Sequence, residues 1–442
     1  MATCTLHLGN VKQDIIKTSM KKSALFISMI VGVSTLIQIL TQIIVTRIFG
    51  AKVELDTFLA AVALPTIIVS AIYGTLSDTI IPLIKKEKDE DIPSYIFCTA
   101  IYLGLIGLVV SIILSHFSRE ITVLLYGTEK TSFINQTAFY TFYLIYSIPF
   151  ALVNTVFGAY LYSRKKFLLF PSVQLVGTIL GLCLTIWLAP TLGIVSLVIA
   201  FFLSLLIQLP FIFPKVPRIS LSFKKAQIGI LILSWVPLII SNFAVSNSTL
   251  IMRSFSSHLP VGYIVYVNLA SKLFAAAVGI MTIGIQTIFL PHLVDLIHSH
   301  EVKKIETQVV KAKFAAWVVS LGVIIFIILV APFFMRLILV GGKFTAPDVE
   351  KLIAIFPYFI APAMGWGISQ VYFQPLIALR KQYKLAILNV GAAALGWFVA
   401  FYVQSLWGDL YAIMAGLTVL LFTGIIGAEI LWIKEKRLLL SK

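Results

Sequence analysis

A pattern of helix breakers and basic turns occurs twice in this chain, about 214 residues apart. Each copy has a Leu-x-Gly step, an apolar segment that contains a proline, a short basic turn, and a second apolar segment that contains a glycine. Because the order is the same in both copies, the sequence predicts two copies of one membrane unit, an arrangement typical of secondary transporters. The matching positions are Gly127 with Gly341, Pro149 with Pro362, Ser163–Phe167 with Leu379–Tyr383, and Gly177 with Gly391.

The composition is that of a membrane protein. Hydrophobic residues make up 60% of the 442 residues, charged residues make up 12%, and the mean hydropathy is +1.02. A membrane-spanning helix needs about 20 apolar residues, and such runs follow one another nearly from end to end. The chain is therefore predicted to be an all-α polytopic membrane protein with about 12 transmembrane helices. The predicted spans are 24–46, 56–84, 93–115, 133–162, 169–190, 192–214, 227–252, 261–293, 314–335, 350–378, 384–405 and 409–433.

The twelve spans divide into two six-helix lobes. Six is an even number, so both lobes enter the membrane in the same orientation, and we expect an axis along the membrane normal with a central cavity between the lobes. Prolines inside several spans are expected to kink their helices. The predicted divisions are a cytoplasmic tail 1–23, an N-lobe 24–214, a cytoplasmic linker 215–226, a C-lobe 227–433 and a cytoplasmic tail 434–442.

The net charge of +16 does not indicate nucleic-acid binding, because the basic residues follow the membrane topology. With the N-terminus in the cytoplasm, 25 of the 34 lysines and arginines fall on the cytoplasmic side and eight on the other side. This asymmetry places both termini in the cytoplasm and predicts affinity for anionic membrane lipids. Met20-Lys21-Lys22 before an apolar run could be the natural start, so either Met1 or Met20 could begin the chain.

No constellation of residues predicts catalysis, a metal site or a cofactor. The three cysteines have neither metal nor redox spacing, and His298 and His300 are too sparse for a metal site. Gly341-Gly342-Lys343 lacks the spacing of a phosphate-binding loop. The sequence therefore predicts a transporter rather than an enzyme, driven by the membrane potential or by a monovalent cation gradient.

Two basic residues in or beside the spans are candidates for binding. Lys272 lies about a third of the way along its span with no acidic neighbour in the helix. Because a charge inside a membrane is costly, we expect it to face the cavity and bind an anion. The alternative is a lysine that snorkels to the interface or forms a structural ion pair. Arg253 is expected at the outer interface, with ligand contact as the alternative.

The acidic candidates have simpler explanations. Asp56 begins the second span, where an acidic residue suits a helix N-terminus. Asp78, near the cytoplasmic end of that span, is expected to pair with Lys85, with cation binding in the cavity as the alternative. Glu429, near the end of the last span, is expected to be structural.

Uncharged polar residues cluster in the first span of each lobe. In span 1, residues 34, 38, 41 and 42 share one helical face, and span 7 contains a similar group around Asn242 and Asn247. Such faces can simply hold neighbouring helices together. The two polar groups lie at equivalent positions of the two lobes, and Lys272 follows the second group in the next span. This arrangement favours a hydrophilic central cavity.

Three sets of motifs resemble a known family. The motifs are Arg47–Ala51 with Leu55–Phe58 and Ala63–Pro65, then Leu259–Gly262 with Ala270–Leu273 and Phe289–Pro291, then Gly342–Thr345 with Asp348. In these motifs the chain resembles the MurJ/MviN family of lipid II flippases, within the multidrug/oligosaccharidyl-lipid/polysaccharide exporter superfamily. The resemblance implies a V-shaped, two-lobed bundle that carries a polyprenyl-pyrophosphate-linked sugar from the inner to the outer leaflet.

The sequence departs from this family in its cavity charges. The family usually has arginines in its first span, where this chain has Thr35 and Thr41. Of the family's cavity cations, the position of Lys272 is retained, as Lys in place of Arg, and Asp56 matches the family's acidic residue. The twelve predicted spans are two fewer than in the family's usual form.

The predicted function is a flippase that moves a lipid II-like undecaprenyl-pyrophosphate-linked glycan across the bacterial inner membrane by alternating access. Envelope glycan synthesis enzymes are predicted partners. A flippase for O-antigen, capsule or exopolysaccharide units is one alternative; a cation-coupled multidrug antiporter and a non-transporting scaffold are two others. The predicted substrate-binding residues are Lys272, Asp56, Thr41, Gln38, Gln42, Asn242, Asn247 and Arg253.

Overall fold

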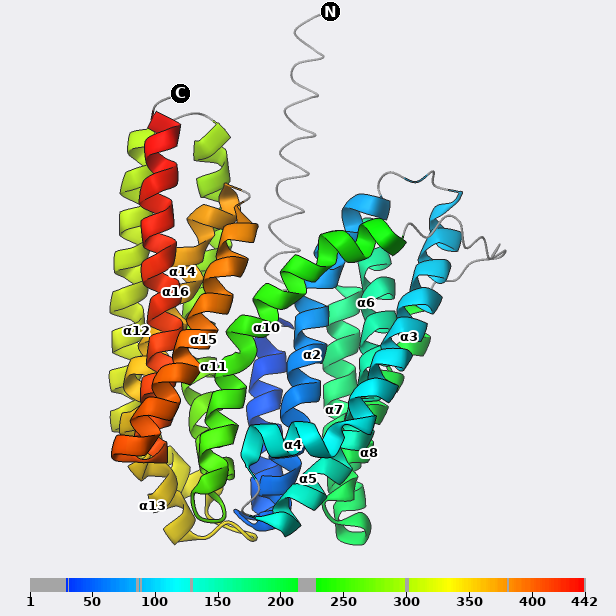
Figure 1. The fold of residues 1–442 in the computed structure, drawn as a ribbon, viewed down its shortest axis with the longest axis vertical. Coiled ribbons are helices and arrows are strands. Elements are labelled where there is room, and N and C mark those ends of the chain that lie inside the picture. Colours follow the sequence, from blue (N-terminus) through cyan, green and yellow to red (C-terminus); the bar gives the residue numbers. More distant parts are fainter. Residues whose placement is uncertain are drawn as a thin grey trace, which may run out of the picture.

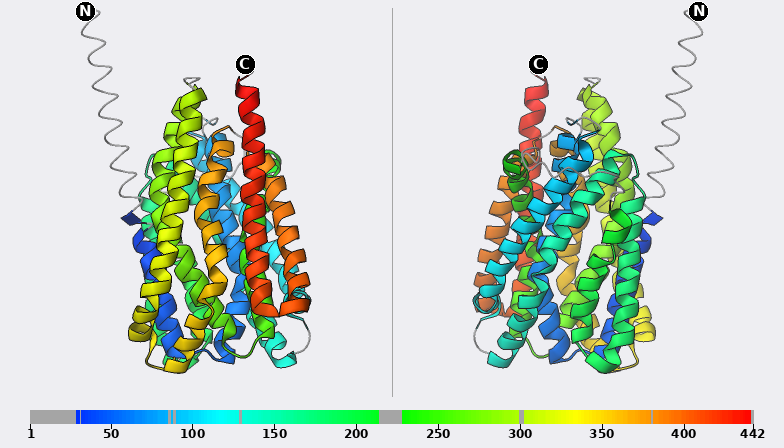
Figure 2. Two further views of the ribbon diagram at one scale, coloured as in Figure 1. Left: turned by 90° about the vertical axis from the view of Figure 1, so that its left-hand side faces the viewer. Right: turned by 90° about the vertical axis from the view of Figure 1, so that its right-hand side faces the viewer.

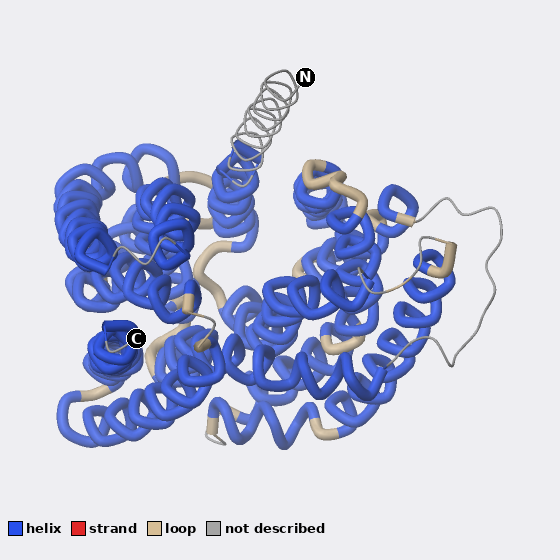
Figure 3. The backbone as a smooth tube through the Cα atoms, turned by 90° about the horizontal axis from the view of Figure 1, so that it is seen from above, coloured by secondary structure: helices blue, strands red, loops and turns tan. Residues whose placement is uncertain are grey.

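The computed structural model of the chain describes residues 29–30, 32–84, 87, 90–127, 130–213, 228–298, 302–379 and 381–440. These residues form helices joined by short turns and contain no strand (Figure 3). The predicted tail 1–23 and the whole predicted linker 215–226 lie outside the described residues.

The N-lobe, by which we mean the helices before residue 214, forms one side of the bundle (Figure 1). Its helices are Gly32–Phe49, α2 (Val53–Ile84), α3 (Ile92–His116), α4 (Ser118–Tyr126), α5 (Thr131–Leu144), α6 (Ser147–Ser163), α7 (Leu169–Leu192), α8 (Val195–Leu206) and α9 (Leu209–Ile212). Most of these helices are apolar, while the short α4 carries charged residues.

The C-lobe, the helices after residue 227, forms the other side. In both side views the long helices of the two lobes run along the same axis (Figure 2). The C-lobe helices are α10 (Ile228–His258), α11 (Tyr263–His298), α12 (Val302–Leu339), α13 (Ala346–Ala354), the 3₁₀ turn η2 (Phe356–Phe359), α14 (Ile360–Ala378), α15 (Gln382–Trp407) and α16 (Asp409–Leu440).

The helices confirm the predicted all-α membrane fold. Among the described residues, ten helices are long and apolar enough to cross a membrane. A pair that bends by 41° around residue 355 raises the number to eleven when it is treated as one span. The segment Tyr263–Gly279 of α11 is apolar but shorter. Each of the twelve predicted spans thus falls on a helix or on a broken helix.

The internal repeat is visible as matching interruptions of the helices. Gly127 ends α4 with φ +77° and Gly341 follows α12 with φ +133°, a backbone region that favours glycine. Pro149 and Pro362 both stand in the first turn of a helix, where a missing N–H costs no hydrogen bond. Each of these prolines lies just after an interruption of its predicted span, whereas Pro65 and Pro237 lie inside the continuous helices α2 and α10.

Helix α10 crosses from one lobe to the other (Figure 1). Near its N-terminus Leu231 is fully buried in the core of the N-lobe. One turn later the Trp235 indole donates a hydrogen bond to the Thr75 hydroxyl of α2, at 2.8 Å. Near its C-terminus Phe255 packs against Trp397 of α15, with ring centroids 5.9 Å apart. The first helix of the C-lobe therefore completes the core of the N-lobe.

The first helix of the N-lobe makes the reciprocal contact. Gln42 accepts a hydrogen bond from Lys272 of α11. At the helix end the Arg47 carbonyl accepts a hydrogen bond from the Lys343 N–H, at 2.8 Å, in the turn between α12 and α13. Each of the two repeat-equivalent helices thus contacts the opposite lobe.

Hydrogen bonds join the lobes at one end of the bundle, the lower end in Figure 1, which we call the sealed end. The Asp56 carboxylate of α2 accepts the N–H groups of Gly262 and Val265 at the start of α11, at 2.6 and 3.1 Å. Lys130 donates to the carbonyls of Ser257 and Leu259, at 2.7 and 3.0 Å. An anion at a helix N-terminus and a cation at a helix C-terminus both complement the helix dipole, so the turn between α10 and α11 is held from both sides.

The turn after α12 also contributes to the sealed end, through a close backbone approach. Gly342 has φ +63°, and a Cβ at this position would lie 2.3 Å from the Arg47 carbonyl oxygen. Only glycine fits both this conformation and this contact. The glycine therefore allows the first helix to dock on the C-lobe.

Candidate binding cavity

A cavity of about 580 Å³ lies between the lobes, directly beside the sealed end. Its walls come from the first helix, α2, α7, α8, α10 and α11, with Trp366 added by α14. The lining residues of α2 begin at Phe58, five residues after that helix starts, so the sealed end forms the floor of the cavity. The predicted central cavity is therefore present.

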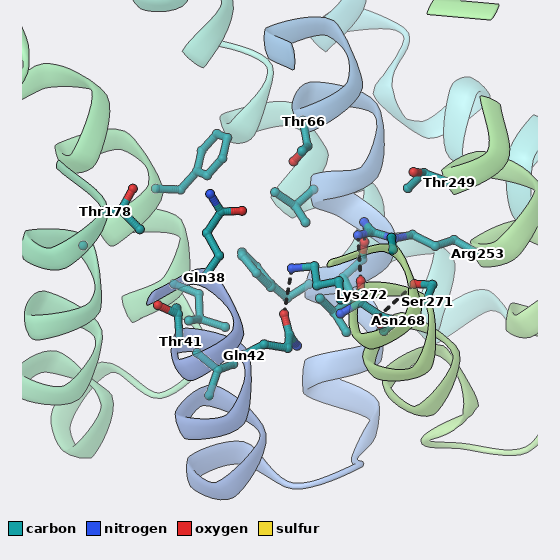
Figure 4. Close-up of a pocket in the computed structure, with 18 of the residues that line it drawn as sticks. Gln38, Thr41, Gln42, Thr66, Thr178, Thr249, Arg253, Asn268, Ser271 and Lys272 are labelled. Carbon is teal, nitrogen blue, oxygen red and sulfur yellow. Dashed lines mark hydrogen bonds between the residues drawn. The ribbon is translucent and has the colours of Figure 1, made fainter. Parts of the chain in front are cut away.

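Lys272 lies on the α11 wall and is exposed to the cavity (Figure 4). Its ammonium group donates a hydrogen bond to the Gln42 amide oxygen, at 2.9 Å. A neutral amide orients the ammonium group without neutralising it, and the ammonium has three N–H donors. The cation therefore keeps charge and donors available for an anion.

Arg253 of α10 lines the same cavity and is only 7% exposed. Its guanidinium donates to the carbonyl of Leu59 and, at 3.3 Å, to the amide oxygen of Asn268. The interfacial position predicted for Arg253 is wrong, because α10 continues to His258 and packs this turn between α2 and α11.

Two amide groups next to these cations have unpaired donors. Gln42 and Asn268 are 7% and 6% exposed, and the amide oxygen of each accepts a hydrogen bond from one of the two cations. Their nitrogens, Nε2 and Nδ2, have no hydrogen-bond partner among the described residues. A buried donor without a partner costs about 1–3 kcal/mol, so a hydrogen-bond acceptor bound here would recover that energy.

The cavity contains basic side chains and no acidic ones among the described residues that line it. A charge in a poorly polarisable site acts more strongly than it does in water. The cavity therefore favours anions and disfavours cations. Among the described residues there is also no group of three or more His, Cys, Asp or Glu side chains that could hold a metal ion.

The wall opposite the cations carries uncharged polar groups (Figure 4). Gln38 and Thr41 of the first helix lie here as predicted. Thr178 of α7 and Ser204 of α8 also line the cavity, although neither was among the predicted binding residues. A signal for α7 was present, because Gln174 and Thr178 are four residues apart on one helix face.

Three residues predicted to bind substrate lie outside the cavity lining. Asp56 is 5% exposed and caps α11 rather than its own helix. The Asn247 amide oxygen accepts a hydrogen bond from the Trp397 indole, at 3.0 Å. The Asn242 amide oxygen accepts one from the Ser246 hydroxyl, at 3.5 Å. These contacts give the three side chains packing roles in the observed conformation.

The two remaining acidic residues are also remote from the cavity lining. Glu429 accepts a hydrogen bond from Lys313 of α12, in agreement with a structural role. Asp78 is exposed on α2, and its predicted partner Lys85 lies outside the described residues.

Comparison with known sequences connects the chain to one family. The family model described as "Lipid II flippase MurJ" matches residues 45–374. A protein of Bdellovibrio bacteriovorus described as "Probable lipid II flippase MurJ" is 25% identical over 176 residues. That alignment covers 39% of this chain and 33% of the relative, so the chain matches about a third of the relative's length.

Comparison with solved structures shows the same fold. A structure of lipid II flippase MurJ in an inward closed conformation has a TM-score of 0.78, with 16% identity over 93% of this chain and 87% of that chain. An inward-facing multidrug resistance MATE family transporter has a TM-score of 0.72, with 16% identity over 92% and 95% of the two chains. An outward-facing MATE family transporter has a TM-score of 0.58, with 16% identity over 96% and 97%.

Proposed function

The chain belongs to the family of the lipid II flippase MurJ, and from that premise we propose that it is a flippase for a lipid-linked, pyrophosphate-bearing saccharide. The observation that carries the proposal is the presence of Lys272 and Arg253 in one cavity whose described lining has no acidic side chain. A phosphate has acceptor oxygens and negative charge, and both cations offer donors. The cavity therefore matches the charged part of such a cargo.

The polar lining of the cavity supports the same cargo class. A saccharide with a pyrophosphate cannot cross hydrocarbon without a polar path. The cavity supplies one beside the first helix and α11, while the polyprenyl tail remains in the bilayer. Transport then requires that the polar head move between the leaflets and that the tail follow in the lipid.

We propose that the sealed end faces the outside of the bacterial inner membrane. The positive-inside asymmetry places the turns at this end away from the cytoplasm. Hydrogen bonds of Asp56 and Lys130 close this end, and the TM-score is higher with the inward-facing than with the outward-facing MATE family transporter. The structure then corresponds to an inward-facing state, and alternating access would break these contacts and form others at the cytoplasmic end.

The lining of the cavity also argues against two of the alternative functions. A cation-coupled drug antiporter needs an acidic group to bind its cation, and none lines the described cavity. A scaffold without transport has no use for a cavity with two costly cations. Flippases for O-antigen, capsule or exopolysaccharide units share the required chemistry, so cargo identity must come from direct comparison of lipids.

Reconstitution into liposomes tests the proposal. Fluorescent undecaprenyl-pyrophosphate-linked glycans, one with the lipid II head group and one with an O-antigen-type sugar, are placed in both leaflets, and a membrane-impermeant quencher reports movement between them. We expect quenching of the inner-leaflet pool for at least one glycan. Transport of an organic cation without movement of either glycan lipid would refute the flippase and favour the antiporter.

A further inference from the structure

We propose that Thr178 of α7 and Ser204 of α8 form a saccharide subsite that selects hydroxyl-rich head groups. This inference rests on the proposed function and assigns the wall of the cavity opposite the cations. Both side chains are partly exposed and line the cavity.

The hydroxyl protons of this wall are already used within the protein. Thr41 donates to the carbonyl of Ile37, at 2.7 Å, and Thr178 donates to the carbonyl of Gln174, at 3.0 Å. Ser204 donates to the carbonyl of Phe201, at 2.7 Å. A hydroxyl has one donor and two acceptor lone pairs, so each of these groups offers the cavity acceptor capacity only.

An acceptor-only wall recognises donors. Saccharide hydroxyls and N-acetyl amides supply O–H and N–H donors, whereas a phosphate supplies acceptors. A phosphate placed against this wall would meet lone pairs with no proton between them. The same phosphate placed against Lys272 and Arg253 would meet donors and positive charge.

The two kinds of wall lie on opposite sides of the cavity. In Figure 4, Thr178 and Thr41 lie on one side, and Lys272 and Arg253 lie on the other. Gln38 projects between them, is exposed, and makes no hydrogen bond within the part of the chain that the structure describes. Its amide can both donate and accept, which suits the junction between pyrophosphate and first sugar.

Glycines of α7 bring the subsite together. A Cβ at Gly177 would lie 2.6 Å from the Ser204 carbonyl oxygen, and a Cβ at Gly181 would lie 3.3 Å from the Ser204 Cβ. These contacts let α7 and α8 approach closely. Thr178 and Ser204 therefore present their oxygens on one continuous surface.

The arrangement divides one cargo between two lobes. The saccharide would contact α7 and α8 of the N-lobe, and the pyrophosphate would contact α10 and α11 of the C-lobe. A complete cargo can therefore bridge the lobes, whereas a lipid pyrophosphate without sugar contacts the C-lobe alone.

The test compares two lipids on the same protein in nanodiscs. The lipids are fluorescent undecaprenyl pyrophosphate and the same lipid carrying the preferred glycan. Thr178→Val with Ser204→Ala removes the acceptors at nearly constant volume. We expect the affinity for the glycan lipid to fall about tenfold, as the loss of two hydrogen bonds predicts, and the affinity for the bare lipid to stay unchanged.

Two further variants separate recognition from structure. Thr191→Val alters the same helix outside the cavity, where Thr191 is exposed and donates to the Leu188 carbonyl, and should change neither affinity. Thr178→Ser keeps the acceptor and should retain glycan binding. An unchanged affinity of the double variant for the glycan lipid, or an equal loss for both lipids, would overturn the subsite. Failure of the unmodified protein to bind either lipid would instead overturn the proposed function, and the subsite with it.

Discussion

Asp56 and Gly262 are 206 residues apart in the sequence, yet the carboxylate of one accepts the backbone N–H of the other at 2.6 Å. The second oxygen of Asp56 accepts the N–H of Val265. One buried side chain of the N-lobe thus provides the N-terminal cap of a C-lobe helix. The contact ties the fold of α11 to closure of the sealed end, because α11 loses its cap whenever the lobes separate here.

Replacement of this carboxylate should weaken the closed state. Asp56→Asn keeps the size but leaves one acceptor and turns an NH₂ group toward a backbone N–H. We expect the free energy of unfolding in detergent to fall by about 1.5–3 kcal/mol, the range for hydrogen bonds to charged groups. Thermal unfolding of the purified protein measures the change. Glu54→Gln, at an exposed position in the same turn, is the control and should have little effect; equal midpoints for the two variants would contradict the capping role.

The glycine turn after α12 offers a second test of the sealed end. Gly342→Ala places a Cβ 2.3 Å from the Arg47 carbonyl oxygen and should destabilise the protein by about 1–3 kcal/mol through steric overlap. Gly193→Ala is the matched control, because Gly193 also has positive φ but has no atom within 4 Å of the added Cβ. Comparison of the two melting curves separates the contact from backbone strain. A loss no larger than that of Gly193→Ala would show that the Arg47 contact is unimportant.

Lys272 should be required for transport but not for insertion. We expect Lys272→Ala to reduce flipping of the preferred glycan lipid roughly tenfold or more, because a charge-assisted hydrogen bond is lost. Lys272→Arg should retain part of the activity because the charge remains. Lys351→Ala, an exposed lysine on α13, should behave as the unmodified protein. Normal flipping by Lys272→Ala at normal expression would remove the anion site.

The cargo can be tested by genetic rescue. Thr41 lines the cavity where the family resemblance implies an arginine, so we expect the unmodified protein to rescue a strain depleted of its lipid II flippase poorly. Thr41→Arg should improve growth because it adds a third cation to the cavity. Thr41→Gln, similar in length but uncharged, should not. Full rescue by the unmodified protein would instead make lipid II the leading cargo.

The orientation predicts which turns are accessible from outside the cell. In a variant without Cys4, Cys98 and Cys183, Lys166→Cys should resist an impermeant thiol reagent in intact cells. Lys52→Cys, exposed at the sealed end, should react. The opposite pattern would invert the topology.

The sequence predicted those features that depend on local composition. Apolar runs located the spans, because a bilayer imposes the same length on every crossing helix. The glycines at 127 and 341 located equivalent interruptions, since positive φ favours glycine wherever it occurs. Lys272 was predicted to face the cavity for a similar reason, because an isolated charge in an apolar membrane helix is costly unless it faces a cavity or a partner.

Features that depend on a distant partner were not predictable in this way. Arg253 bonds to Leu59, 194 residues away, and no local pattern distinguishes this burial from an interfacial position. Asn247 pairs with Trp397, 150 residues away, so its amide packs against α15 instead of lining the cavity. Thr178 was missed because a threonine that bonds its own helix looks like any other threonine in sequence.

The contacts of each first helix with the opposite lobe also have a consequence for assembly during synthesis. Gln42 meets Lys272 only after 230 further residues have been made, which takes roughly 10–50 s at about 5–20 residues per second. Until then the Gln42 amide of the first helix lacks its hydrogen-bond partner Lys272. The N-lobe likewise lacks Leu231 in its core until synthesis passes the middle of the chain. The final packing of Gln42 and of the N-lobe core therefore requires residues from the second half of the chain.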